Sequence, residues 1–295
     1  MHNIYSFFTK VFVIFFSLLI IFFFFSKNNL FTNEIINTLD LWLKKIVPSI
    51  ITMYVISSIL ICTKAIDVLI FLLKPLRKII KFESTNAFNL FIISIFIGNP
   101  SSATYITEYL SKNYISQKDA NILLLSSSFV NPLFIFTVAK DVKLFIFIYI
   151  IHIISNVIIV SFLTRKNTIQ NIKNETNMNF FDSLNKLPFL LLLIALYMVI
   201  SSIIIFVLSY LGINRLYLSF IEMSTGCNII INSVLESKIL LLILLITFNG
   251  LCIHMQVATI LNNQRMYRTF FIGRILSMII TIIIYFFVIF FLKYA

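Results

Sequence analysis

Long apolar stretches, interrupted at a few points by small and polar residues, dominate this chain. Several runs are long enough for a membrane-spanning helix, which needs roughly 20 apolar residues. We count about nine hydrophobic segments by this pattern. Polar residues 26–45 and 165–186 read as connections between segments. The plainest apolar runs are residues 7–25, 144–163, 188–211 and 270–292, and residues 46–62 form a shorter one.

Two pairs of breaks interrupt the remaining apolar segments. In the first half, residues 98–102 (GNPSS) are followed by the break at 126–132 (SSSFVNP). In the second half, residues 222–226 (EMSTG) are followed by 249–256 (NGLCIHMQ). A break at membrane depth is tolerated where protein or a watery cavity covers the freed backbone groups. Paired breaks at matching places in two halves predict a transporter with a binding site near the bilayer midplane.

The pattern therefore predicts an all-α polytopic membrane protein. We expect two inverted-type repeats that contain discontinuous or re-entrant helices. The longest polar linker is the natural boundary between them. The predicted divisions are an N-terminal transmembrane helix at 1–30, a first repeat at 31–165, a linker at 166–186 and a second repeat at 187–295.

Composition excludes several other classes of protein. Hydrophobic residues make up 60% of the chain and charged residues 12%, and the mean hydropathy is +1.03, which places the chain far from soluble domains. The net charge of +12 comes from basic residues between apolar segments, a distribution typical of membrane proteins, so nucleic-acid binding is not expected. The three cysteines lack metal-ligand spacing, and no hydrolase, protease or P-loop motif occurs. We expect no enzyme activity, no cofactor and no metal.

Glu222 and His254 are the candidates for coupling or gating. An acid within the apolar segment 216–235 should face protein or water rather than lipid. The alternative is a structural ion pair between Glu222 and Arg215 or Lys238. His254 follows the second break, where an imidazole could bind solute or carry a proton. Its alternative is a packing role.

Neutral hydrogen-bonding groups beside the breaks are the candidates for solute binding. A helix broken after Glu222 would also direct free backbone amides at a bound anion or polar solute. Ser126 and Ser127 are as readily explained by close helix packing. The candidate residues are Asn99, Ser101, Ser102, Ser128, Asn131, Ser224, Thr225, Asn249 and Gln256.

Four ordered motifs resemble one known family. Residues 98–139 resemble the glycine–proline loop and N-P-L-F-I helix of the sporulation integral membrane protein YlbJ (SpoVV-like) family. Residues 222–226 and 248–256 resemble its E-x-T-x-G and F-x-G-L-S-x-H-x-Q motifs, and a basic segment follows. Asn99, Ser102 and Cys252 depart from the pattern. The family belongs to the nucleoside-recognition (Gate) superfamily.

This resemblance implies inverted repeats with re-entrant hairpins, and transport of dipicolinic acid across the membrane around a developing spore. The expected partners are the lipid bilayer and a small polar or anionic solute, with coupling to protons or another cation. Glu222 suits coupling better than direct anion binding, because its charge would repel a dicarboxylate. The rival hypothesis is a non-transporting membrane scaffold for sporulation or envelope assembly that uses the 165–186 linker.

Overall fold

The computed structural model describes residues 2–167 and 179–294, and this part of the chain is helical with no strand. Five of the described helices are long and apolar enough to cross a membrane. The molecule is a helical membrane protein by this criterion, as the sequence predicts. The number of nine segments and the repeats stay predictions. The five candidate spans are Asn28–Cys62, Val142–Thr164, Phe180–Tyr210, Lys238–Leu261 and Gln264–Phe291.

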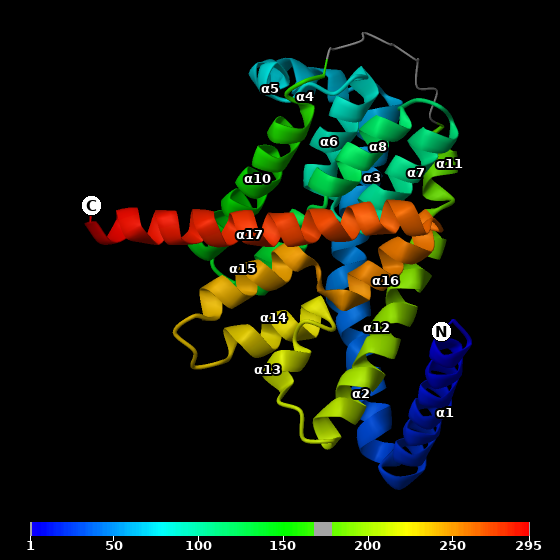
Figure 1. Ribbon diagram of the computed structural model, residues 1–295. Coiled ribbons are helices and arrows are strands. Elements are labelled where there is room, and N and C mark those ends of the chain that lie inside the picture. The colour runs from blue at the N-terminus through cyan, green and yellow to red at the C-terminus, as the bar shows by residue number, and fades with distance from the viewer. Residues whose placement is uncertain (1, 168–178, 295) are drawn as a thin grey trace.

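The elements follow one another with short connections, except between α10 and α11 (Figure 1). The first half holds α1 (His2–Ser26), α2 (Asn28–Leu41), the π-helical turn η1 (Trp42–Ile46), α3 (Val47–Cys62), α4 (Ile66–Leu72), α5 (Lys74–Ile79), α6 (Thr85–Ile97), α7 (Ser101–Ser111), α8 (Gln117–Ser126), α9 (Pro132–Ala139) and α10 (Val142–Thr164). The second half holds α11 (Phe180–Leu184), α12 (Leu187–Tyr210), α13 (Arg215–Leu218), α14 (Met223–Ile231), α15 (Lys238–Phe248), α16 (Gly250–Leu261) and α17 (Gln264–Tyr294). Residues 168–178 of the predicted linker lie outside the described part.

The expected polar connection at residues 26–45 is wrong. Helix α2 begins at Asn28 and continues through η1 into α3. One face of α2 packs on apolar partners: Phe31 is buried and its ring lies 5.4 Å from that of Phe206 on α12. Thr38 is the other buried residue of α2, whereas Leu30, Ile36 and Leu39 are exposed. Figure 1 shows α1, α2 and α12 side by side at one end of the molecule.

Each half contains a turn between two helices and then a broken helix. Helices α6 and α7 form an antiparallel hairpin, because Asn86 near the start of α6 donates to the carbonyl of Tyr114 just beyond α7 (3.1 Å). Its tip is residues 98–100, and the following helix is divided into α8 and α9. In the second half, α13 and α14 flank the tip at residues 219–222, and the following helix is divided into α15 and α16.

Serine N-caps fix the outer ends of the first hairpin and the first broken helix. Ser84 accepts from the amide of Ala87 (3.1 Å) and Ser116 accepts from the amide of Asp119 (3.0 Å). The Asp119 carboxylate in turn accepts from the amides of Glu83 (3.2 Å) and Ser84 (3.0 Å), so it joins the starts of α6 and α8. Burial raises the pKa of Asp119, although these hydrogen bonds oppose the shift.

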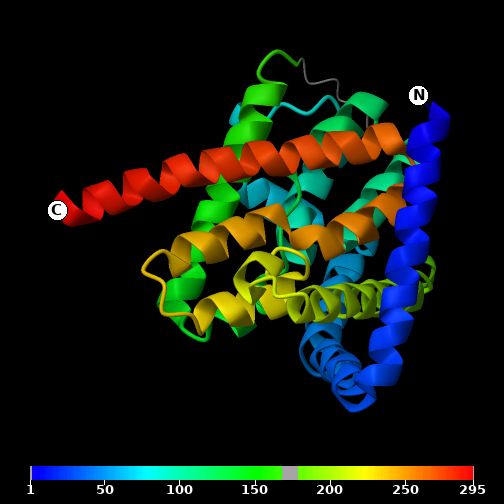
Figure 2. The ribbon, with the colours of Figure 1, turned by 60° about the horizontal axis from the view of Figure 1, so that its bottom comes forward.

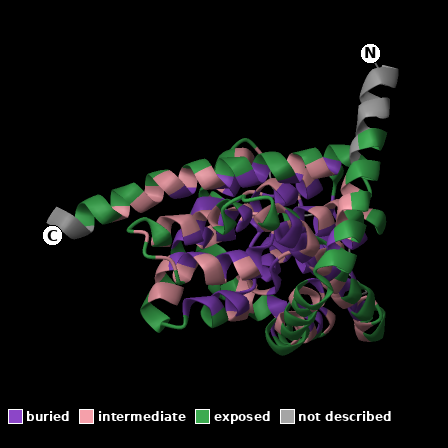
Figure 3. Ribbon diagram, turned by 90° about the horizontal axis from the view of Figure 1, so that it is seen from below, coloured by how far each residue is buried: buried purple, intermediate pink, exposed green. Residues whose placement is uncertain are grey.

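Helix α17 runs across α10 rather than along it, in the views of both Figure 1 and Figure 2. Seen from below in Figure 3, buried residues gather at the centre, while the outward faces of the peripheral helices are exposed. Large apolar side chains are prominent on those faces, including Phe162 at 77% and Phe287 at 62% exposure. An apolar outer surface is what lipid tails solvate.

Candidate functional site

Each hairpin tip is hydrogen-bonded to the break of the helix that follows it. In the first half, the Asn99 amide donates to the carbonyl of Phe129 (2.8 Å). In the second half, the amides of Leu251 and Cys252 donate to the carbonyls of Phe220 (2.9 Å) and Ile221 (2.8 Å). The neighbouring tip therefore satisfies part of the backbone groups that each break frees, as an apolar environment requires.

Gly98 allows the first tip to approach its break. Its φ is +69°, and a Cβ there would lie 2.3 Å from the backbone nitrogen of Asn131. A side chain is excluded by contact as well as by conformation. On the other side of the contact, α9 begins at Pro132, whose missing N–H costs nothing at the first helical position. Asn131 caps α9 by accepting from the amide of Leu133 (2.9 Å).

The polar side chains of the first break bond partly to one another and partly to backbone groups. Asn99 donates through Nδ2 to Ser128 Oγ (2.8 Å), and Ser102 donates to Asn99 Oδ1. Asn131 donates through Nδ2 to the carbonyl of Ser49 on α3 (3.0 Å). His152 on α10 accepts through Nε2 from the amide of Val130 (3.2 Å), so it has a structural contact at the first break.

The second break is formed by two consecutive residues with positive φ, Asn249 (φ +74°) and Gly250 (φ +63°). In an unbroken helix the amides of Leu251 and Cys252 would donate to the carbonyls of Thr247 and Phe248. Those amides instead serve the hairpin tip, so the two carbonyls need other donors. His254 Nε2 lies 2.9 Å from the Phe248 oxygen. Arg274 Nη1 donates to the Thr247 oxygen (3.3 Å).

Arg274 on α17 joins both breaks. Its side chain is fully buried, and no acidic residue pairs with it in the described part of the chain. The carbonyls of Leu125 and Thr247 belong to the last turns of α8 and α15, where the helix dipole is negative, and the carbonyl of Ser128 lies just beyond α8. One guanidinium, with five donors, can serve both ends. Its first-half acceptors are Ser128 O (3.0 Å), Leu125 O (3.2 Å) and Asn156 Oδ1 (3.3 Å).

Glu222 caps its own helix. Its carboxylate accepts from the amides of Ser224 (2.9 Å) and Thr225 (2.7 Å) at the start of α14. The amides expected to be free for an anion are therefore occupied, which corrects that expectation. Within the described residues Glu222 forms no ion pair with Arg215 or Lys238, so the structural ion-pair alternative is not met. The side chain is 3% exposed.

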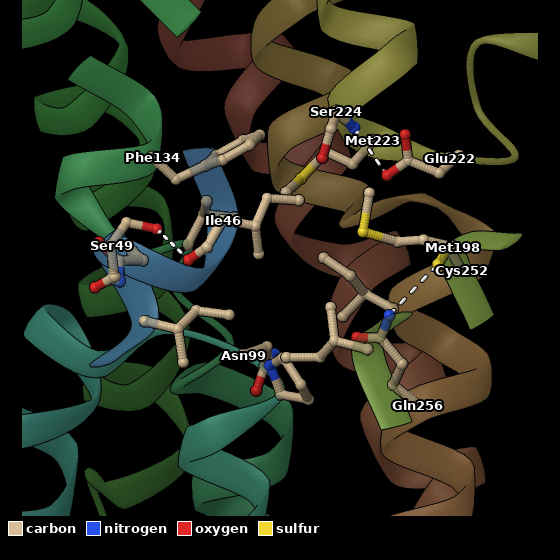
Figure 4. Close-up of a pocket in the computed structure, with 16 residues that line it drawn as sticks. Ile46, Ser49, Asn99, Phe134, Met198, Glu222, Met223, Ser224, Cys252 and Gln256 are labelled. Atoms are coloured by element: carbon tan, nitrogen blue, oxygen red, sulfur yellow. Dashed lines mark hydrogen bonds between the residues drawn. The ribbon is translucent and has the colours of Figure 1, made fainter. Parts of the chain in front are cut away.

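The two tips and the two breaks surround one cavity of about 50 Å³ (Figure 4). Helix α3 of the first half and helix α12 of the second half also line the cavity, through Ser49 and Met198 respectively. Gln256 Oε1 has no hydrogen-bond partner, although Gln256 is 1% exposed. Of the predicted site residues, Asn99, Asn131, Glu222, Ser224 and Gln256 line this cavity.

The other predicted site residues lie beside the cavity rather than on its lining. Ser101, Ser102, Ser128, Thr225, Asn249 and His254 are in this group.

His254 packs among aromatic rings. Its ring centroid lies 4.6 Å from that of Phe248 and 5.1 Å from that of Phe270. Together with the bond to the Phe248 carbonyl, this gives His254 a structural role at the second break. Its role in coupling stays a prediction.

Sequence reasoning did not single out Arg274, Ser49 or Met198. An arginine inside the apolar run 270–292 is itself a signal, because a charge within a membrane-length segment marks a buried partner or a site. Ser49 and Met198 carry no comparable signal, since such residues are common in membrane helices.

No group of three or more potential metal ligands occurs in the described part of the chain. Comparison with protein-family models, with curated proteins and with solved structures finds no match for this chain. The family resemblance therefore stays a prediction that rests on the four sequence motifs.

Proposed function

We propose that this protein is a membrane transporter or facilitator of a small polar solute, which binds where the four chain breaks meet. The observation that carries the proposal is the shared cavity, lined by both hairpin tips and both broken helices. Buried polar groups at membrane depth are costly, and they persist where they serve a pathway or a site. A scaffold would have no need of them.

The unpaired Gln256 Oε1 supports solute binding at this place. A buried polar atom without a partner costs about 1–3 kcal/mol. A solute that donates to this oxygen would recover that free energy when it binds. The motif resemblance favours a transporter of the YlbJ-like, nucleoside-recognition type, and dipicolinate is the first anionic solute to test.

The cavity volume indicates an occluded state. A buried water needs roughly 10–15 Å³ of such volume, so about 50 Å³ holds a few waters or a very small solute. A larger solute requires the tips to move away from the breaks. The hairpin–helix bonds of Asn99, Leu251 and Cys252 are the contacts that such an opening would break first.

Uptake by proteoliposomes that contain the purified chain tests the proposal. Labelled dipicolinate, with a nucleoside for comparison, is supplied with and without a pH gradient. Saturable uptake of either compound, lost in empty liposomes, is the expected result. Absence of flux for both compounds in both protein orientations, with the protein folded, would contradict the proposal.

A matched pair of variants ties any flux to the cavity. Glu222→Gln removes the charge that lines it, and Glu236→Gln removes an equal charge from an exposed loop. We expect the first to lower flux or change its pH dependence and the second to leave both unchanged. Equal effects of the two variants would show that flux does not depend on the charge in this cavity.

A further inference from the structure

The carboxamide side chains on the cavity lining differ in how far they are satisfied within the protein. There are three of them, and one N–H of each NH₂ group donates to a protein acceptor. The oxygen of Gln256 is the counterpart without a donor. The cavity therefore presents an acceptor to its solute. The three occupied donors are Asn99 to Ser128 Oγ (2.8 Å), Asn131 to Ser49 O (3.0 Å) and Gln256 to Cys252 Sγ (3.2 Å).

The charged side chain on the cavity lining is negative. Glu222 is the acidic residue on the lining, and no lysine, arginine or histidine occurs among its described lining residues. Charge-assisted hydrogen bonds from two backbone amides stabilise the carboxylate. Arg274 forms no ion pair with Glu222 in the described part of the chain, and its Nη atoms donate to carbonyls of the two breaks and to Asn156.

The remaining lining is apolar, with Ile50, Phe134 and Met198 among its members. Figure 4 shows Glu222 and Gln256 on the second-half side of the cavity, across from Ser49 and Phe134. A carboxylate solute would lie near Glu222 with no cation to balance it, and like charges repel strongly where the effective dielectric constant is low. A solute with N–H or O–H groups would satisfy Gln256.

Resting on the proposed function, we infer that the solute is a small neutral or cationic molecule that carries hydrogen-bond donors, and that carboxylate anions are disfavoured. Gln256 accepts from the solute, and Glu222 selects against negative charge. Both residues belong to the second half of the chain, so the second hairpin and the second broken helix set the specificity.

Three compounds with one skeleton test the inference. Pyridine-2,6-dicarboxamide is neutral with N–H donors, and 2,6-bis(aminomethyl)pyridine is cationic. Pyridine-2,6-dicarboxylate is dipicolinate itself, a dianion of similar size, which the motif resemblance favours and this inference disfavours. Their dissociation constants for the purified full chain are measured by calorimetry, with melting temperature as a second readout. We expect the diamide and the diamine to bind at least about tenfold more tightly than the dicarboxylate.

Tighter or equal binding of the dicarboxylate would overturn the inference, and so would the failure of all three compounds to bind. Two variants sharpen the result. Gln256→Met removes the unpaired oxygen at similar size and should weaken diamide binding by about tenfold. Glu222→Gln should reduce the preference for the diamine over the dicarboxylate.

The matched controls are Gln264→Met and Glu236→Gln, which change exposed residues of the same types. They should bind all three compounds as the unchanged protein does. Melting temperatures without ligand show which variants fold, and either cavity variant alone is sufficient for the test. Unchanged selectivity in a folded cavity variant would contradict the inference.

Flux of the same three compounds into proteoliposomes separates this inference from the proposed function. Diamide binding without flux of any compound would remove the transport function and leave the specificity of the cavity intact. Saturable dicarboxylate flux with no diamide or diamine binding would support transport and overturn the inference.

Discussion

The two broken helices differ in how they satisfy the groups that their breaks expose. At the first break, Asn99 and Ser128 bond to each other, and Asn131 bonds to backbone groups of α3 and α9. At the second break, both side-chain polar atoms of Asn249 and the oxygen of Gln256 are buried without partners. At the first break the carboxamides of Asn99 and Asn131 are paired through both oxygen and nitrogen, and the buried atom left without a partner is Nδ1 of His152. The second break retains more unsatisfied polar atoms, and one of them belongs to a residue on the cavity lining, as a binding surface requires.

Arg274 is the residue that the two breaks share, and its loss should have the largest effect. Arg274→Met would leave carbonyls of α8 and α15 without a donor, and we expect destabilisation of about 3 kcal/mol or more. Thermal unfolding in detergent, followed by the reaction of a thiol dye with buried Cys227 and Cys252, measures it.

The exposed Arg268 lies on the same helix and provides the control for this test. Arg268→Met should change stability by less than about 0.5 kcal/mol. Equal melting temperatures for the two variants would refute the shared role of Arg274.

Adding a side chain where a tip contacts a break should destabilise the first half more than the second, because the backbone approach is closer in the first half. A Cβ at Gly98 would lie 2.3 Å from Asn131 N, whereas a Cβ at Gly250 would lie 3.1 Å from Met223 N. Gly98→Ala should therefore cost about 2–3 kcal/mol, and Gly250→Ala nearer the roughly 1–2 kcal/mol of positive φ alone.

Melting temperatures of the two alanine variants test the ranking. Gly212→Ala is the control, because φ is +87° there and no atom lies within 4 Å of the added Cβ. It reports the conformational cost alone. If Gly98→Ala lowered the melting temperature no more than Gly212→Ala does, the first tip would not approach its break as closely as described.

Removing the side-chain caps Asn131 and Glu222 should lower stability by similar amounts, but only the loss of Glu222 should change solute selectivity. Asn131→Ala and Glu222→Ala each remove an N-cap, of α9 and α14 respectively, and each should cost about 1 kcal/mol. Glu222→Ala should in addition relax the discrimination against anionic solutes, because it removes the charge on the cavity lining. Paired melting and binding measurements check both effects. An equal change of selectivity in Asn131→Ala would remove the distinction between the halves.

His254 should matter for structure more than for coupling. His254→Phe keeps an aromatic ring but loses the donor to the Phe248 carbonyl, so we expect a loss of about 1 kcal/mol. The pH dependence of flux should not change, because His254 does not line the cavity. A flux profile that lost its pH dependence in this variant would restore the coupling role predicted from the sequence.

Ser126 should give the smallest effect. Its hydroxyl donates to the carbonyl of Ile122 within α8 (2.7 Å), a local bond that leaves no group unpaired when the side chain is removed. Ser126→Ala should change stability by less than about 0.5 kcal/mol and leave binding unchanged. A change in solute affinity would show that the first break takes part in binding after all.

The positions of the breaks could be predicted from the sequence because local chemistry determines them. Pro132 cannot continue a helix, and Gly98 and Asn249 occupy left-handed or other positive-φ conformations. The helix within residues 26–45 could not be predicted because its apolar stripe is narrow. The contact of Phe31 is with Phe206, a residue far away in the chain.

The meeting of the four breaks depends on contacts between distant segments. The bonds of Arg274 to Leu125 and Ser128 have no local sequence signature. For the same reason the sequence could not show that Glu222 occupies the amides of its own helix, or that Gln256 is left with an unpaired oxygen. Both facts determine which solute the cavity favours.

Solute protection of Cys252 is the most direct test of a binding site between the breaks. Cys252 lines the cavity, and Cys62 and Cys227 are replaced by serine to isolate it. The rate of Cys252 alkylation is measured by mass spectrometry as the concentration of the best-bound solute is raised. We predict that alkylation slows, with half of the effect at the dissociation constant of the solute. An alkylation rate that is unchanged at saturating solute would show that the solute binds elsewhere.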